Sequence, residues 1–236
     1  MKIVAIDSSG LVASVAVATK DTLLAEYTVN YKKTHSQTLL PMLDEISGMI
    51  ELDMESIDAI AVSAGPGSFT GLRIGSATAK GLGLALSKPI IAVPTVDALS
   101  YNGWGTSDLI CPIMDARRNQ VYTGFYAFDE EDNHIVLKEQ FAEDIETVIE
   151  QLNDIGKKVL FLGDAVPVYE KIIQEKMKVP FRFAPHTMNR QRASCLALAA
   201  VKYYEQGIMQ TSEEHSPIYL RMSQAERERE EQLGRN

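Results

Sequence analysis

The sequence predicts an α/β protein of two lobes that repeat one plan: three strands, a helix, a strand and a helix (βββαβα). Two observations support this fold class. Strand-like and helix-like segments return in the same order after Ile110, and the corners "VSAGPG" and "FLGDAV" follow a buried strand at the equivalent point of each half. With 236 residues, of which 45% are hydrophobic and 23% charged, the chain is long enough to form two cores.

The first half begins with three strand-like segments, "KIVAID", "LVASVAVAT" and "TLLAEYTVNY". Ser-Gly and Lys-Asp turns separate them, which predicts a meander. The segment "HSQTLLPMLDEISGMIE" predicts a helix, because apolar residues recur at helical spacing: Leu39, Leu43, Ile46 and Ile50. After it, "DAIAVSAG" predicts a buried strand that leads through the first glycine corner into a second helix. The segment "PIIAVP" predicts the closing strand of this half.

The second half predicts strands in "ICPIMDAR", "VYTGFYAF" and "HIVLKEQFA", a helix in "EDIETVIEQL", a strand in "KVLFLGD" and a helix in "VPVYEKIIQEK". Glycines and small polar residues in "YNGWGTSD" predict the boundary between the halves. We therefore expect a first lobe over residues 1–104 and a second lobe over residues 105–224. The second lobe would include the amphipathic helix "RASCLALAAVKYYEQG" and the short extended piece "SPIYLR". We expect residues 225–236 to form a charged tail, either as a solvated helix or as a frayed terminus.

Charge and cysteine content exclude several classes of protein. The formal net charge of −9 argues against a chain that alone holds a nucleic-acid backbone, although a basic partner could bring it to RNA. Cys111 and Cys195 lie far apart in apolar surroundings, which predicts free thiols rather than a disulfide framework. The N-terminus lacks the apolar run of a signal peptide, and no apolar stretch reaches about 18 residues, so we expect a cytoplasmic protein.

The stretch "SAGPGSFTGLRIG", Ser63 to Gly75, has the composition of either a phosphate-binding loop or a tight turn that starts a helix. Two nucleotide-binding spacings, GxxxxGK[ST] and GxGxxG, both fail at Thr70, where each needs a glycine. The residue types therefore favour a structural turn, with Ser68 or Thr70 capping the helix that follows.

Other catalytic patterns are also incomplete. Ser68 does not lie in a GxSxG elbow, and the four histidines, His35, His134, His186 and His215, show no metal-ligand spacing. Four aspartates stand near strand ends, where carboxylates can act as acids or bases: Asp7, Asp97, Asp115 and Asp164. We interpret Asp97 and Asp164 as turn or capping residues. Asp7 and Asp115 remain open, because each occupies the first corner of its repeat.

Two helices of the first half predict a partner surface. Small residues repeat every four positions along the second helix and would allow another helix to approach closely: Gly71, Gly75, Ala79 and Gly83. The preceding helix carries apolar residues on more than one face: Leu39, Leu43, Ile46 and Ile50 on one, and Leu40, Met42 and Met49 beside it. One sheet can cover only one stripe, so the remainder is expected to meet a partner. The alternative, that the small-residue stripe packs on its own sheet, stays open.

The doubled plan, with Asp7 ending the first strand, resembles the actin, sugar-kinase and Hsp70 superfamily. The likeness is more specific in five segments that stand in order along nearly the whole chain: "AIDSSG", "SAGPGSFTGLRIG", "MDARRNQVY", "LGDA" and "PIYLR". Together they resemble the bacterial TsaB family, also called YeaZ, which belongs to the machinery that makes threonylcarbamoyladenosine in tRNA next to the anticodon.

This resemblance implies a noncatalytic subunit without cofactor or metal. It would pair with the catalytic relative TsaD, alongside the ATPase TsaE, and it would reach tRNA only through that complex. The first-half helices would form the pairing surface, and the same surface would form a homodimer when the chain is alone. Which arginines touch RNA, Arg117 and Arg118 among them, is left open.

A comparison with the catalytic relative supports the noncatalytic interpretation. That relative carries a metal-binding HxxxH pair after the glycine corner and helix, and Thr95 and Leu99 stand at the corresponding places here. The turn after the first strand and the glycine corner would then keep the shape of an ancestral phosphate loop without its catalytic surroundings. The residues concerned are Asp7, Ser8, Ser9, Gly65, Gly67 and Ser68. The alternative function is an ATP-dependent phosphotransferase or hydrolase of the same superfamily.

Overall fold

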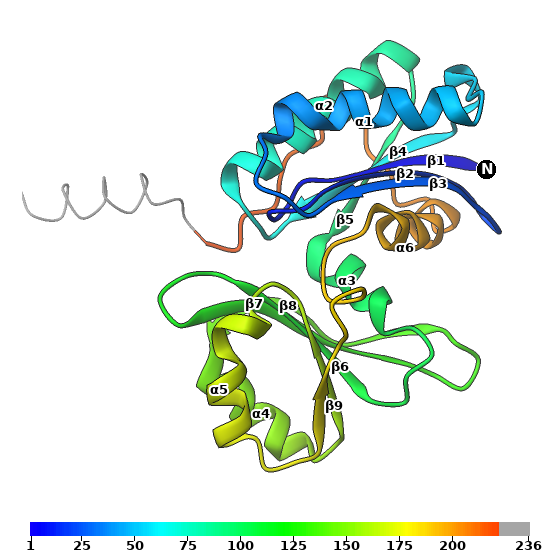
Figure 1. Ribbon diagram of the computed structural model, residues 1–236. Coiled ribbons are helices and arrows are strands. Elements are labelled where there is room, and N and C mark those ends of the chain that lie inside the picture. Colours follow the sequence, from blue (N-terminus) through cyan, green and yellow to red (C-terminus); the bar gives the residue numbers. More distant parts are fainter. Residues whose placement is uncertain (222–236) are drawn as a thin grey trace, which may run out of the picture.

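The computed structural model describes residues 1–221, and it contains two five-stranded sheets (Figure 1). The first sheet has the strand order β3-β2-β1-β4-β5 and the second β10-β9-β6-β7-β8. Read from its other edge, the second order is β8-β7-β6-β9-β10, which matches the first strand for strand. The predicted duplication is therefore confirmed.

The elements of the first repeat lie close to their predicted bounds. They are β1 (Lys2–Asp7), β2 (Ala13–Thr19), β3 (Leu23–Val29), α1 (His35–Met49), the one-turn helix η1 (Met54–Ser56), β4 (Ala59–Gly65), α2 (Phe69–Leu86) and β5 (Ile90–Pro94). Two short helices, α3 (Thr95–Ser100) and η2 (Tyr101–Gly103), then lead to the second lobe.

The second repeat follows the same plan. Its elements are β6 (Leu109–Asp115), β7 (Gln120–Phe128), β8 (His134–Asp144), α4 (Ile145–Ile155), β9 (Val159–Leu162), α5 (Val166–Lys176) and β10 (Phe181–Phe183), and the last helix is α6 (Ala193–Glu205). The segment "SPIYLR" forms no strand, although its Ile218 amide donates to the Ala64 carbonyl over 2.7 Å. The predicted charged tail, residues 225–236, lies outside the described residues.

Both faces of the first sheet are buried. On β1, Val4 and Ile6 pack in the cluster beneath α1 and α2, whereas Ile3 and Ala5 pack in the cluster under α6. Successive side chains of a strand point to opposite faces, so a strand covered on both sides must be apolar at every position. This explains why "KIVAI" is apolar almost without interruption.

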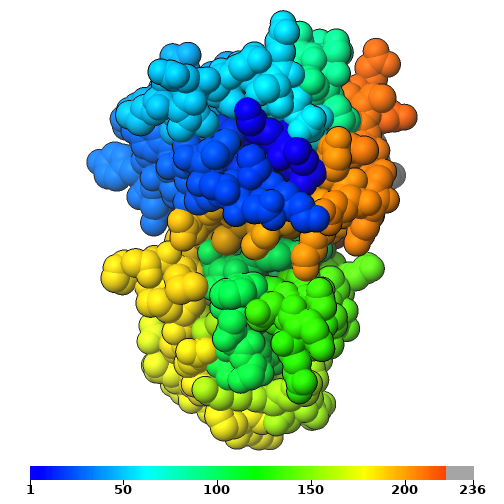
Figure 2. Space-filling view, turned by 90° about the vertical axis from the view of Figure 1, so that its right-hand side faces the viewer, coloured from blue at the N-terminus to red at the C-terminus, as the bar shows by residue number. Residues whose placement is uncertain are grey.

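Helix α6 packs on the first sheet, which corrects its assignment to the second lobe. Its alanines, Ala193, Ala197 and Ala200, share a cluster with Ala5 and Ala61 of the sheet. Small residues on both sides allow the helix to lie close to the strands. In Figure 1 the helix lies beneath the first sheet, and in Figure 2 the orange C-terminal residues join the upper, blue lobe.

Helix α3 connects the two lobes. Its Val96 and Leu99 are buried in a cluster with Met114, Tyr126 and Leu160 of the second sheet. The lobes therefore share a core at this junction. Among the described residues, no helix is both long and apolar enough to cross a membrane.

Candidate functional site

The first corner, which joins β1 to β2, is organised by a buried aspartate. Asp7 is almost fully buried, and its Oδ1 accepts from the Ser9 amide at 2.9 Å and the Ser9 hydroxyl at 2.7 Å. Burial raises the pKa of the Asp7 carboxyl, and the two Ser9 hydrogen bonds oppose that rise. Asp7 thus shapes the turn through its own loop.

The glycine corner before α2 packs directly on the first corner. The Ser68 amide donates to the Ser9 carbonyl over 2.7 Å, and the Ser68 hydroxyl accepts from the Gly71 amide at 3.3 Å, which caps α2 as the sequence predicted. A Cβ on Gly67 would lie 2.3 Å from the Ser9 oxygen, and one on Gly71 would lie 2.1 Å from the Ser8 oxygen. Two amides that could face an anion at this helix end are therefore committed to protein oxygens.

Equivalent glycines mark the strand-to-helix corner of each repeat. Gly65 has φ +118° and Gly163 has φ +113°, a backbone region that side chains rarely adopt. A Cβ on Gly65 would meet the Ile218 carbonyl at 2.2 Å, and one on Gly163 would meet the Ile113 carbonyl at 2.0 Å. The two corners predicted to be equivalent therefore share a backbone conformation and a close contact with a carbonyl oxygen.

The second corner, which joins β6 to β7, uses its acidic residues for local structure. The Asp115 amide donates to Asp164 Oδ1 at 3.1 Å, and Asp115 Oδ1 accepts from the Arg117 amide at 2.8 Å. Asp115 also pairs with the Arg117 guanidinium at 3.5 Å. Burial raises the pKa of the Asp164 carboxyl, opposed in part by the hydrogen bond from Asp115. Asp164 holds a turn, as expected.

Asp97 has a different role from the turn or cap that the sequence suggested. Its Oδ1 accepts from the Tyr126 hydroxyl at 2.5 Å, and its Oδ2 accepts from the Tyr203 hydroxyl at 3.3 Å. These tyrosines belong to β7 and α6, so the carboxylate links the second sheet to the helix under the first. Burial raises the pKa of Asp97, and the two tyrosine hydrogen bonds oppose that rise.

The two positions that replace the HxxxH pair have structural contacts. The Thr95 hydroxyl accepts from the Gly65 amide at 3.1 Å, and Leu99 lies in the core between the lobes. Within residues 1–221, no group of three or more His, Cys, Asp or Glu side chains could hold a metal ion. Both cysteines are free thiols as predicted; Cys111 is buried and Cys195 half-buried.

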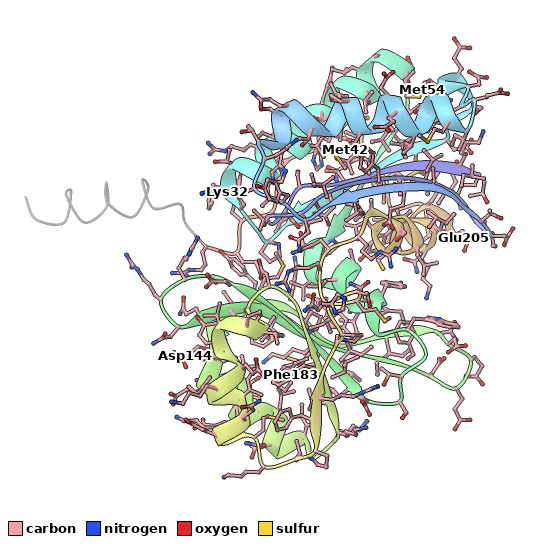
Figure 3. The ribbon with its side chains drawn as sticks, viewed as in Figure 1. Lys32, Met42, Met54, Asp144, Phe183 and Glu205 are labelled. Atoms are coloured by element: carbon pink, nitrogen blue, oxygen red, sulfur yellow. The ribbon has the colours of Figure 1, made fainter. Side chains whose placement is uncertain are left out.

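The α1 residues predicted for the partner surface do not lie on the surface. Leu39, Leu43 and Ile46 are almost fully buried in the core beneath the helix, and Ile50 packs against the same cluster. Figure 3 shows Met42 below α1, between the helix and the sheet. The sheet therefore covers more of this helix than the sequence suggested, which corrects the interface assignment of these four residues.

The small-residue stripe of α2 also faces inward. Gly71, Gly75, Ala79 and Gly83 are all buried. A Cβ on Gly75 would lie 2.4 Å from Ser8 Oγ, and one on Gly83 would lie 2.4 Å from Ser212 Oγ. The stripe lets α2 approach the first corner and the C-terminal segment, which is the alternative that the sequence left open. The predicted close packing exists, but it is within the chain.

The exposed sides of α1 and α2 instead carry apolar and small residues, of which the sequence analysis had noted only Leu40 and Met49. We call this surface the α1–α2 outer face; it comprises Leu40, Gly48, Met49, Ala77, Gly81, Leu84 and Ala85. Met49 is 75% and Leu84 62% exposed, and a Cβ on Gly48 or Gly81 would meet no atom within 4 Å. The repeat of Ala77, Gly81 and Ala85 was the available signal, since it has the same four-residue spacing as the buried stripe.

The duplicated sheet order and the paired glycine corners define a two-lobed α/β protein of the actin, sugar-kinase and Hsp70-like class. The family model described as TsaD, tRNA N6-adenosine threonylcarbamoyltransferase, matches residues 22–229. The chain belongs to this family, and within it to the TsaB, or YeaZ, branch.

Named relatives support this placement along the whole chain. The tRNA threonylcarbamoyladenosine biosynthesis protein TsaB of Bacillus subtilis is 33% identical over 232 residues, which cover 96% of each chain. The protein of the same name from Escherichia coli is 34% identical over 153 residues, covering 61% of this chain and 65% of its own. The structure of YeaZ from Pseudomonas aeruginosa superposes with a TM-score of 0.77 at 24% identity, covering 93% of this chain and 100% of that one. The fold is therefore that of YeaZ.

Proposed function

We propose that this chain is a noncatalytic subunit of the machinery that forms threonylcarbamoyladenosine in tRNA. It pairs with a catalytic chain of the TsaD type, works alongside the ATPase TsaE, and acts in the cytoplasm. The names of its relatives support the pathway. The observation that carries the noncatalytic role is the closed first corner, where Ser68 donates to the Ser9 carbonyl.

A working phosphate site needs free amides at the helix end and space beside them. Here the carbonyls of Ser8 and Ser9 fill the space next to Gly71 and Gly67, within 2.3 Å of where a Cβ would stand. The corner is thus a vestige of a phosphate loop, which disfavours the alternative of an ATP-dependent phosphotransferase or hydrolase.

A subunit without chemistry acts through a surface, and the α1–α2 outer face fits that role. Leu84 and Met49 are large apolar side chains exposed on helices, while a Cβ on Gly81 or Gly48 would meet no atom within 4 Å. Another pair of helices can pack closely against such a surface and cover its apolar area. The catalytic chain occupies this face in the complex, and a second copy of this chain occupies it in a homodimer.

The pairing is tested with Leu84→Glu, which places a charge in the proposed interface. We expect this variant to lose at least about tenfold in affinity for the TsaD-type chain in a titration, because the charge would be desolvated without a partner. Val168→Glu on α5 is the matched control, since Val168 is 60% exposed and Leu84 62%. Unchanged pairing of Leu84→Glu would reject this face as the interface.

A further inference from the structure

A C-terminal strap, residues 207–221, crosses the outside of the first lobe and ends at the second. It begins beside β5, where Gln210 and Ile90 exchange two backbone hydrogen bonds of 2.8 and 3.0 Å. It continues past β4, where the Ile218 amide donates to the Ala64 carbonyl. The strap is therefore anchored along its length.

The end of the strap brings three elements together. Tyr219 contacts Phe69 at the start of α2, and the Arg221 guanidinium donates to the Ala116 carbonyl in the loop between β6 and β7. Figure 1 shows the same arrangement: the red-orange strap ends between the N-terminal end of α2 and the second sheet. These contacts bring α2, the strap and the second corner together at the junction between the lobes.

A stacked aromatic pair lies at this junction. The rings of Phe69 and Tyr219 are parallel within 2°, with centroids 4.3 Å apart. The Arg73 guanidinium lies 5.7 Å from the Phe69 centroid, and its Nε donates to the Tyr219 hydroxyl at 3.3 Å. Tyr219 remains 40% exposed. Tyr219 thus presents an aromatic ring that stacks on Phe69 and has the Arg73 guanidinium beside it.

The surrounding sequence is basic although the chain is acidic. Residues 68–80, 116–119 and 215–221 contain no Asp or Glu, while the chain as a whole has a net charge of −9. These segments contain five basic residues: Arg73, Lys80, Arg117, Arg118 and Arg221. The Arg117 side chain is 86% exposed, and Asp115 is its acidic neighbour. Arg73 and Arg221 lie at the strap, whereas Arg117 and Arg118 line a pocket of the second lobe together with carboxylates of Asp115, Asp144 and Glu146.

We infer that this basic aromatic patch binds an unpaired nucleotide of the tRNA substrate together with its flanking phosphates; the patch comprises Phe69, Arg73, Tyr219 and Arg221. The inference rests on the proposed function, since tRNA reaches this chain within the complex. Bases of single-stranded RNA stack on exposed aromatic rings, and arginines neutralise the phosphates on either side. A patch this small adds to the affinity of a complex and orients the RNA, which is consistent with a chain too acidic to bind RNA alone.

The charge contribution is tested in the assembled complex with the double variant Arg73→Gln/Arg221→Gln. Filter binding of tRNA over a series of salt concentrations should show affinity about 3- to 30-fold lower. The slope of log affinity against log salt should fall in magnitude by about 0.7 to 1.4, because each lost phosphate contact to a single strand removes about 0.7. The control, Lys20→Gln/Lys157→Gln, removes the same charge from exposed positions elsewhere and should leave both quantities unchanged.

The stacking contribution is tested at Tyr219. Tyr219→Ala removes the ring and should lower tRNA affinity roughly five- to hundredfold, the range expected for one stacked base. Tyr219→Phe keeps the ring and loses only the hydroxyl, so it should bind tRNA nearly as the wild type does. If Tyr219 had only a structural role, Tyr219→Ala would lower the melting temperature, and the two variants would not differ in tRNA affinity.

The outcomes separate this inference from the proposed function. A wild-type complex that fails to assemble or to retain tRNA overturns both. A wild-type complex that retains tRNA, with Arg73→Gln/Arg221→Gln and Tyr219→Ala equal to it in affinity and slope, overturns the patch alone. A free mononucleotide shares the chemistry of the patch, so ATP is titrated in parallel. If Tyr219→Ala weakens ATP binding but leaves tRNA affinity unchanged, the patch recognises a free mononucleotide rather than tRNA, and the inference is overturned.

Discussion

The Tyr126 hydroxyl donates to Asp97 Oδ1 over 2.5 Å, and this hydrogen bond joins a strand of the second sheet to a helix that leads out of the first. Asp97 is a mostly buried carboxylate, and Tyr203 from α6 supplies its second donor at 3.3 Å. Tyr126 itself is fully buried in the core that the lobes share. The relative position of the lobes therefore depends on a polar contact within an apolar junction.

Tyr126→Phe removes that contact and should destabilise the fold. A hydrogen bond to a charged group contributes about 1.5–3 kcal/mol, and its loss leaves the buried carboxylate with fewer donors. Thermal unfolding should therefore shift down by about 2–4 °C for each kcal/mol lost. Tyr203→Phe is the control, because its bond is longer and its loss should cost less. An equal or larger loss for Tyr203→Phe would contradict the assignment of Tyr126 as the main link.

The buried aspartates predict a pH dependence with a definite sign. Burial raises the folded-state pKa of Asp7 above 3.8, against the hydrogen bonds from Ser9. The folded state then binds more protons than the unfolded state between the two pKa values. The contribution of Asp7 to stability is fully present below 3.8 and is lost as the pH rises through the folded pKa. Asp97 and Asp164 shift in the same direction.

Asp7→Asn tests this sign, because the amide keeps an oxygen for Ser9 and cannot ionise. Relative to the wild type, the variant should gain stability as the pH rises from 4 to 7, by about 1.4 kcal/mol for each unit of pKa shift. Denaturant unfolding at several pH values measures this difference. Asp154→Asn, which makes the same substitution at an exposed position on α4, is measured in parallel as the control. A variant that loses relative stability with rising pH would refute the direction of the shift.

Two glycines of α2 should respond oppositely to alanine. At Gly71 the new Cβ would meet the Ser8 carbonyl at 2.1 Å, a backbone atom that cannot move cheaply, so Gly71→Ala should destabilise by about 1–3 kcal/mol. At Gly81 the Cβ would enter open space, and Gly81→Ala should stabilise the helix by about 0.5–1 kcal/mol. Denaturant unfolding of the isolated chain measures both changes. The same sign for both variants would contradict the packing described for α2.

These glycines also show what the sequence could and could not predict. Element order and the two glycine corners were sufficient for the duplicated fold, because they depend on local periodicity and on backbone conformations that few residues adopt. The direction in which α2 faces was not predictable, because two sets of small residues repeat every four positions along it: Gly71, Gly75, Ala79 and Gly83, and Ala77, Gly81 and Ala85. Only the tertiary structure distinguishes the stripe that meets Ser8 from the one that meets solvent.

Long-range contacts account for the other errors. Helix α6 follows the second repeat along the chain but packs on alanines of the first sheet, and no local pattern connects residues that far apart. The stacking of Tyr219 on Phe69 joins positions 150 residues apart in the same way. "PIYLR" was noted as a motif, yet its partner could not be identified from spacing.

The closed first corner predicts weak binding of ATP by the isolated chain. The Ser68 amide donates to the Ser9 carbonyl, and the Gly71 amide donates to the Ser68 hydroxyl, so phosphate oxygens would have to displace protein acceptors. Calorimetric titration with ATP and magnesium should therefore give a Kd weaker than about 1 mM, equivalent to less than about 4 kcal/mol of binding free energy. The control is Ser68→Ala, which removes the hydroxyl that accepts from Gly71 and should bind no tighter, because the Ser9 carbonyl still occupies the corner. Micromolar, magnesium-dependent binding would reject the noncatalytic interpretation and favour a phosphotransferase or hydrolase.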